Sequence, residues 1–421
     1  MTSPPTTAAA TDPGPDGVPV LRHPATPRQL AWLEEQLGAW RAEGVVDAPT
    51  AERIRQRYVA HRRLTLARIV LTLGAAFVGI GLVWTVAANL DGLSPLLRFG
   101  LVALVWLALV VVAEVLQRRR EALGDVASPV VGAVRLLAAA AFGAVVFQAA
   151  QSLQVPAGQP ALVGVWAAGT LLYGYAVVGV APVVLGVVLA AVWTVWVSAD
   201  AGRTVLGVTL TVAAAALAAV AVGVLHARLA DRVPAWRALG EPWRELGAVL
   251  ALGALFFAAL PVDDSGERTG GAFWVALGVA VVLAAVAALR ADRLGRAEVA
   301  LAAATLAGVV VLGLWRVSAG LGGVADPTPS DWVRAVVAVL VYLGVTSGYA
   351  VLGGMRDAER LTWAATAALV LFTTVQAFAV FAPVLSGAVL FLAVGVVLIG
   401  TGVVADRGRR RLVAEGREAR S

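Results

Sequence analysis

Long apolar runs separated by short charged segments repeat from residue 67 to residue 404. A run of about 20 apolar residues, at 1.5 Å rise per residue, is long enough to cross the hydrocarbon core of a bilayer as a helix. By this pattern about twelve transmembrane helices are expected, which fixes the fold class as an all-α polytopic bundle. They fall near 67–88, 99–116, 130–150, 161–178, 181–197, 204–225, 246–260, 272–289, 297–314, 333–351, 361–381 and 384–404. Almost no loop separates the two runs around Gly179, so a single broken or re-entrant segment is the alternative there, and the count is twelve or one to two fewer.

The segment before the apolar runs has a different pattern. Residues 1–25 are rich in Pro, Thr, Ala and Gly without apolar periodicity, which predicts a disordered tail. Apolar residues then recur every three or four positions in two short stretches, the spacing of two amphipathic helices. These positions are Leu30, Leu33, Leu37 and Trp40 in the first stretch and Ala51, Ile54 and Tyr58 in the second.

Capping signals mark the ends of both short helices. Thr26 is followed by Pro27 at the first helical position, as at a helix start. Gly44 ends the first helix and Asp47 caps the second. We therefore expect a cytosolic helical hairpin over 26–64, the bundle over 65–405 and a basic cytosolic tail over 406–421. The hairpin is either a packing element on the membrane face or a module that binds a protein partner.

Composition supports a membrane environment. The chain is 60% hydrophobic and 14% charged, with a mean hydropathy of +0.83, whereas a soluble chain carries about 25% charged residues. Cysteine is absent, which excludes disulfides and thiolate chemistry.

Charge predicts the orientation of the chain. The net charge is +6, and arginine clusters fall in alternate connections while acidic residues gather in the opposite ones. Arginine-rich connections stay on the cytosolic side. We expect a multi-pass plasma (inner) membrane protein with both termini in the cytosol. Its expected partners are the lipid bilayer and anionic lipid headgroups at the cytosolic face, and not nucleic acid.

The outer end of the first apolar run carries the first group of candidate residues. Asn89 and Asp91 stand where a short turn joins the first two runs, and Arg98 follows. The two polar residues suit helix capping, and Asp91 is expected to pair with Arg98. Turn chemistry alone explains this composition, so a structural role is favoured over ligand contact.

Charged side chains inside the runs must be paired or face a cavity. Glu114 stands a few residues before Arg118 and Arg119, so a local ion pair at the end of that helix is expected. Arg135, just inside the third run, is expected to reach the cytosolic surface.

Two glutamines near the outer end of the third run are the remaining candidates. Gln148 and Gln151 are three residues apart and share a helical face. Hydrogen bonding between helices is the expected role, and a polar outer vestibule is the alternative.

Catalytic chemistry has little support in the sequence. The three histidines have no second ligand at helical spacing, and no phosphate-binding glycine loop occurs. No catalytic, metal or cofactor-binding residue is predicted. The leading hypothesis is a non-enzymatic integral membrane protein. A transporter or flippase for a small or amphiphilic substrate is the alternative, and a membrane-embedded enzyme comes third.

The N-terminal part resembles a bacterial family of membrane proteins catalogued as domain of unknown function 2157. The resemblance rests on the stretches 37–47 and 51–58, and on a glycine-rich first run that ends in Ala87-Ala88-Asn89 and is followed by Asp91, Ser94-Pro95 and Arg98. Leu90 departs from the family, which usually has Trp at this position. The resemblance covers about residues 30–114 and implies a cytosolic helix pair joined to membrane spans. The family has no established activity, so it implies no mechanism.

Overall fold

The computed structural model describes residues 11–13, 19–21, 23–25, 27–60, 94–122, 129–200, 204–260, 270–315, 328–356 and 358–381, with a few single positions within 70–81 and 392–400. The chain divides into two compact units, Met1–Gly74 and Ala75–Ser421. Apart from four strands of three residues and one short 3₁₀ helix, the elements in these ranges are α-helices. The expected all-helical class is confirmed at this level.

The first unit holds a helical hairpin. Its helices are α1 (Pro27–Ala42) and α2 (Ala48–Gln56). Leu33, Leu37 and Ala51 form its small core, and Trp40 and Ile54 pack against them. These are the apolar positions that the periodicity selected.

The connection between α1 and α2 follows the capping signals. Gly44 has a φ of 73°, a left-handed conformation that glycine adopts at little cost. The Asp47 side chain accepts a hydrogen bond from the Thr50 amide over 3.0 Å and caps α2. Tyr58 was expected on the apolar face of the second helix. That expectation is wrong, because α2 ends at Gln56 and Tyr58 begins strand β4. Thr26, the expected cap of α1, lies outside the described residues.

Short strands flank the hairpin. Strand β1 (Thr11–Pro13) pairs antiparallel with β2 (Pro19–Leu21), with Thr11 opposite Leu21. Strand β3 (His23–Ala25) pairs in parallel with β4 (Tyr58–Ala60), with His23 opposite Tyr58.

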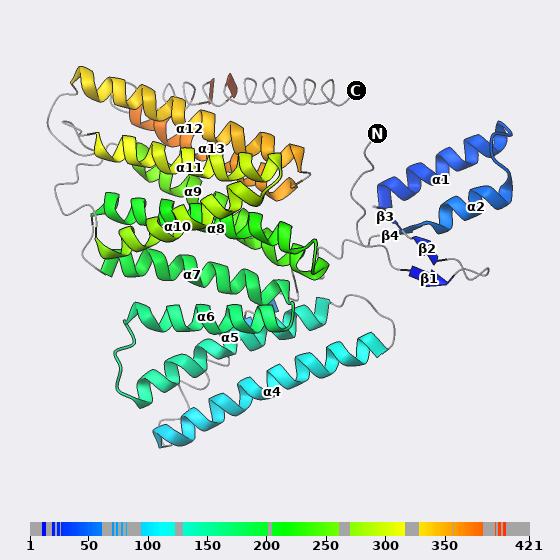
Figure 1. The fold of residues 1–421 in the computed structure, drawn as a ribbon, viewed down its shortest axis with the longest axis horizontal. Helices are drawn as coiled ribbons and strands as arrows, with labels where there is room; N and C mark the ends of the chain where they lie inside the picture. The colour runs from blue at the N-terminus through cyan, green and yellow to red at the C-terminus, as the bar shows by residue number, and fades with distance from the viewer. Residues whose placement is uncertain are drawn as a thin grey trace. The chain divides into compact units, whose positions relative to one another are not determined.

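The second unit is a bundle of long helices. Figure 1 shows them side by side, with the colour running from cyan at α4 to orange at α13, so that neighbours in sequence are mostly neighbours in space. They are α4 (Pro95–Ala122), α5 (Pro129–Ser152), α6 (Pro160–Ala176), α7 (Val180–Asp200), α8 (Val205–Leu229), α9 (Arg237–Ala259), α10 (Gly271–Arg290), α11 (Arg293–Leu314), α12 (Pro329–Met355) and α13 (Glu359–Phe381), with a 3₁₀ turn η1 (Pro234–Trp236) before α9.

Eight helices in the described ranges are long and apolar enough to cross a membrane: α4, α5 and α7–α12. Each corresponds to one of the runs expected from the sequence. Helix α6 has 17 residues and α13 has 23, and both also coincide with expected runs. The runs at 67–88 and 384–404 lie largely outside the described residues.

The turn at Gly179 joins two separate antiparallel helices. Along the α6–α7 contact, Gly174 packs against Val183 near the turn and Gly164 packs against Trp193 far from it. The two helices therefore lie side by side over most of their length and do not form one broken helix, while a re-entrant pair stays the alternative at this turn.

The main core lies around α8, which packs against α7, α9, α10 and α11. Small residues line the α8–α9 contact: a methyl group added at Gly247 would meet Val220, and one added at Gly240 would meet His226. Glycine at these positions lets the two backbones approach closely, as is typical of helices packed within a membrane.

Candidate functional site

The candidate residues chosen from the sequence have different surroundings in the structure. Asn89 and Asp91 lie outside the described residues. Arg98 is in the first turn of α4, where its backbone amide donates to the Ser94 carbonyl. On α5, Gln148 is buried and Gln151 is exposed, so the two do not share one environment.

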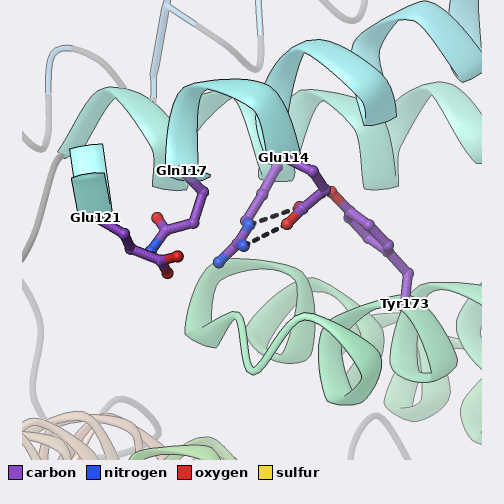
Figure 2. Close-up of polar contacts among 5 residues, drawn as sticks. Glu114, Gln117, Glu121 and Tyr173 are labelled. Carbon is purple, nitrogen blue, oxygen red and sulfur yellow. Dashed lines mark hydrogen bonds and ion pairs between the residues drawn. The ribbon is translucent and has the colours of Figure 1, made fainter. Parts of the chain in front are cut away.

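Glu114 of α4 is held by residues of two other helices. Arg135 of α5 binds both carboxylate oxygens, Nε donating to Oε1 over 2.9 Å and Nη2 to Oε2 over 2.7 Å. The hydroxyl of Tyr173 on α6 donates to Oε1 over 3.2 Å. Figure 2 shows Glu114 and Tyr173 directed toward each other across this junction, with Gln117 and Glu121 hydrogen-bonded further along α4. The cluster ties α4, α5 and α6 together.

These contacts correct two expectations. Glu114 pairs with Arg135 across helices and not with Arg118 or Arg119, both of which are exposed. The Arg135 side chain is only 11% exposed, so it does not extend to the surface. A two-pronged guanidinium–carboxylate pair is shorter and more directional than a local pair along one helix surface, which favours the partner on α5.

A second cluster is centred on Glu298, near the start of α11. The carboxylate is 5% exposed and accepts from Arg244 of α9, through Nε to Oε2 at 3.0 Å and through Nη2 to Oε1. Arg356, directly after α12, places its Nε 2.7 Å from Oε1 as an ion pair. One buried carboxylate therefore holds two arginines from different helices.

Glycine makes room for this cluster. A methyl group added at Gly223 of α8 would overlap the Arg244 side chain. The aliphatic part of the Arg244 side chain thus packs against the α8 backbone at Gly223, and its guanidinium group binds Glu298.

A third cluster joins α6, α8 and α9. Trp243 Nε1 donates to the Tyr175 hydroxyl over 2.8 Å, and that hydroxyl lies 2.8 Å from His226 Nε2. His226 Nδ1 lies 2.8 Å from the Val222 carbonyl, which can only accept. The proton of the neutral ring is therefore assigned to Nδ1, and Tyr175 donates to Nε2.

At the opposite end of the bundle, the described residues include a buried cation, Arg334, near the start of α12. It is 5% exposed and donates to carbonyls at the ends of two helices. Its Nη2 reaches Ala258 at 2.8 Å and Leu312 at 3.2 Å, and further bonds go to Ala259 and Leu260. A cation at the C-terminal ends of α9 and α11 satisfies carbonyls that those helices leave free and offsets their dipoles.

The first three clusters lie at one end of the bundle. Together they take their residues from the C-terminal halves of α4, α6 and α8, from the residue that follows α12, and from the N-terminal parts of α5, α9 and α11. Two close pairs, Tyr173 with Tyr175 and Trp243 with Arg244, link one cluster to the next along the chain. Polar contacts therefore cross the bundle from α4 to α12 at this end.

Sequence analysis missed Glu298 and Arg334 as candidates. A usable signal existed, because each is the single charged residue of its apolar run, 297–314 and 333–351. A lone charge within a run needs a partner from another helix. Among the described residues, no group of three His, Asp or Glu side chains is placed to hold a metal ion.

The model of a family described as "Predicted membrane protein (DUF2157)" matches residues 38–180. This confirms the resemblance seen in the sequence and extends it through α6 to the start of α7. No curated protein and no solved structure matches the chain significantly. The chain is thus similar, over its first part, to membrane proteins of unknown function, and its apolar helices are those of a multi-pass membrane protein.

Proposed function

We propose that the protein is a non-enzymatic, multi-pass protein of the plasma membrane, with its N-terminal hairpin in the cytosol. The proposal is supported by the pairing of the buried charged residues. In the described part of the chain these are Glu298 and Arg334, and each binds partners within the chain. A catalytic acid or base must instead be free to reach a substrate.

The orientation rests on the arginine pattern. The connections before α9 and after α12 are arginine-rich, which supports a cytosolic position for this end of the bundle and for both termini. The exposed arginines at these connections, Arg232 and Arg360, are suited to contact anionic lipid headgroups.

Single cysteines test the orientation without background, since the chain has none. Gly158, between α5 and α6, and Arg232, between α8 and α9, are both exposed. With a membrane-impermeant maleimide, Gly158→Cys should be labelled in intact cells and Arg232→Cys only after lysis. The reverse pattern would overturn the proposed orientation, and the cysteine-free chain serves as the control.

The hairpin is the part we propose to bind a protein partner. The Trp32 side chain on α1 is 57% exposed and is not part of the hairpin core, which consists of three buried residues. Large apolar side chains left in water are common at contact surfaces. A photo-crosslinking amino acid in place of Trp32 should capture a protein, while the same group in place of exposed Arg53 should not. Equal capture at both positions, or capture of lipid alone, would contradict a partner-binding hairpin.

Transport is tested directly. The protein reconstituted in vesicles should show no ligand-dependent flux across a panel of metabolites and amphiphiles. A saturable flux, lost in a variant that retains its melting temperature, would replace the proposal with the transporter hypothesis.

A further inference from the structure

Two arginines share one carboxylate at the junction of α9, α11 and α12. Arg244 Nη2 and Arg356 Nε both contact Oε1 of Glu298, so the two guanidinium groups lie next to each other. Glu298 carries a single negative charge and therefore offsets one of the two positive charges, while the arginines repel each other. The three side chains together keep an excess of positive charge.

The arginines also keep donors that Glu298 does not use. In the described part of the chain, Arg244 Nη1 and both Nη nitrogens of Arg356 make no hydrogen bond, and none of them is a buried atom. The two side chains are 20% and 18% exposed, against 5% for Glu298. Each guanidinium group thus has one part bound to the buried carboxylate and another part at the surface.

The neighbouring carboxylates do not take up these donors. Asp292 caps α11 by accepting from the Gly295 amide over 2.9 Å, and Glu245 of α9 pairs with Arg360. Glu241, near the start of α9, is exposed, so its charge is screened by solvent and ions. Among the described residues, none of these three carboxylates forms an ion pair with the two arginines. The donors are therefore open to an anion from outside the chain.

We propose that Arg244 and Arg356 together bind a phosphate group, carried by an anionic lipid headgroup or present as free phosphate. Two adjacent guanidinium groups match the several oxygens of a phosphate and give it short, charge-assisted hydrogen bonds. Arg356 contributes its two Nη groups and Arg244 contributes Nη1, while Glu298 stays bound to both arginines. The bound phosphate offsets the excess positive charge.

The place of the site in the bundle favours a lipid as the source. The site lies at the arginine-rich end, and the proposed orientation puts that end at the cytosolic leaflet, whose surface is rich in anionic headgroups. The choice of leaflet rests on the proposed function. Binding of a phosphate group rests only on the two arginines.

Thermal unfolding of the full chain in neutral detergent micelles tests the site, because a ligand that binds only the folded protein raises the melting temperature. The probes are short-chain phosphatidylglycerol and inorganic phosphate. Short-chain phosphatidylcholine and sodium chloride of equal ionic strength are the controls. We expect a saturable rise of a few degrees with phosphatidylglycerol, beyond both controls. A rise with this lipid alone identifies a headgroup as the ligand, and a rise with inorganic phosphate shows that free phosphate is sufficient. No rise with either probe would overturn the proposal.

Variants separate the site from general attraction between charges. Arg356→Lys keeps a positive charge beside Glu298 but lacks the two Nη donors, so half-saturation should need several-fold more ligand. Arg244→Lys should act in the same direction and serves as the second variant if the first is unstable. Arg360→Gln is the matched control, because Arg360 is 76% exposed at the same end, and its loss should leave half-saturation unchanged. Equal loss of affinity in Arg360→Gln and Arg356→Lys would overturn the site.

Failure of the site and failure of the proposed orientation give different results. Micelles leave both ends of the bundle accessible, so binding there does not depend on the orientation in a membrane. Reversed labelling of Gly158→Cys and Arg232→Cys would refute the cytosolic leaflet and leave phosphate binding in place. Unchanged melting temperatures with both probes would refute the site and leave the orientation in place.

Discussion

Glu298 and Arg244 are 54 residues apart in the chain, yet Arg244 binds both carboxylate oxygens of Glu298, with Nε 3.0 Å from Oε2. The pair joins α11 to α9, and Arg356 adds α12 through the same carboxylate. Removing one member of a buried ion pair leaves a charge without compensation, which costs more than the pair itself contributes.

Glu298→Gln should therefore destabilise the bundle strongly. We expect a loss of about 3 kcal/mol or more in the free energy of unfolding, the usual scale for breaking a buried pair. Glu245→Gln is the control, since Glu245 pairs at 3.4 Å with Arg360, which is 76% exposed. That change should cost less than about 1 kcal/mol. Chemical unfolding in mixed micelles measures both, and equal losses would contradict the central place of Glu298.

Arg334 should not be replaceable by lysine. Arg334→Gln removes the charge that caps α9 and α11, and we expect a loss of about 3 kcal/mol. Arg334→Lys keeps the charge, but an ammonium group lacks the planar guanidinium that reaches several carbonyls at once. The stability of this variant should therefore lie between those of the original chain and Arg334→Gln. The exposed Arg290 gives the control, because Arg290→Gln is expected to be almost neutral. Melting temperatures of the four proteins decide the order, and a lysine variant as stable as the original would refute the capping role.

Two glycines of adjacent helices should respond in opposite directions to alanine. At Gly223 an added methyl group overlaps Arg244, so Gly223→Ala should cost about 1–3 kcal/mol through overpacking. At Gly253 of α9 no atom lies within 4 Å of the added carbon, so Gly253→Ala should stabilise by up to about 1 kcal/mol through helix propensity. Unfolding free energies of the two variants check the sign of each effect.

Asp47 should make the stability of α2 depend on pH. The hydrogen bonds from Thr50 lower the pKa of the Asp47 carboxyl below its ordinary value. Because the folded pKa is below the unfolded one, the stabilisation is fully present above the unfolded pKa of about 3.9 and is lost as pH falls through the folded pKa. Amide exchange in residues 48–56 should be faster in Asp47→Ala than in the original chain at pH 7, with Asp47→Asn in between. The difference between the original chain and Asp47→Ala should shrink at pH 3. A constant difference across this range would rule out the charged cap.

The sequence predicted helices better than it predicted their ends and contacts. The apolar run at 246–260 locates α9, but the helix begins at Arg237, since charged residues continue a helix wherever it extends beyond the hydrocarbon core. The hairpin core followed from periodicity, because Leu33 and Leu37 are one turn apart and need only one neighbouring helix.

The partners of the charged residues were harder to predict. Glu114 was assigned to Arg118 and Arg119 because these are near in sequence, whereas its partner is on the next helix. Which residues of two helices meet depends on their rotation about their own axes and on close approaches such as that at Gly223. A single sequence does not contain that information in a local pattern.

The burial of α8 has a consequence for the order in which the protein is made. Among the eight candidate spans, α8 is the most deeply buried, and three of the four helices packed on it, α9, α10 and α11, follow it in the chain. Synthesis proceeds from the N-terminus, so α8 enters the membrane while the surfaces of α9, α10 and α11 that later pack on it are still unmade. For that interval α8 has only the earlier helices, α7 among them, to pack against, and its remaining surface is in contact with lipid or with the insertion machinery until α9 follows.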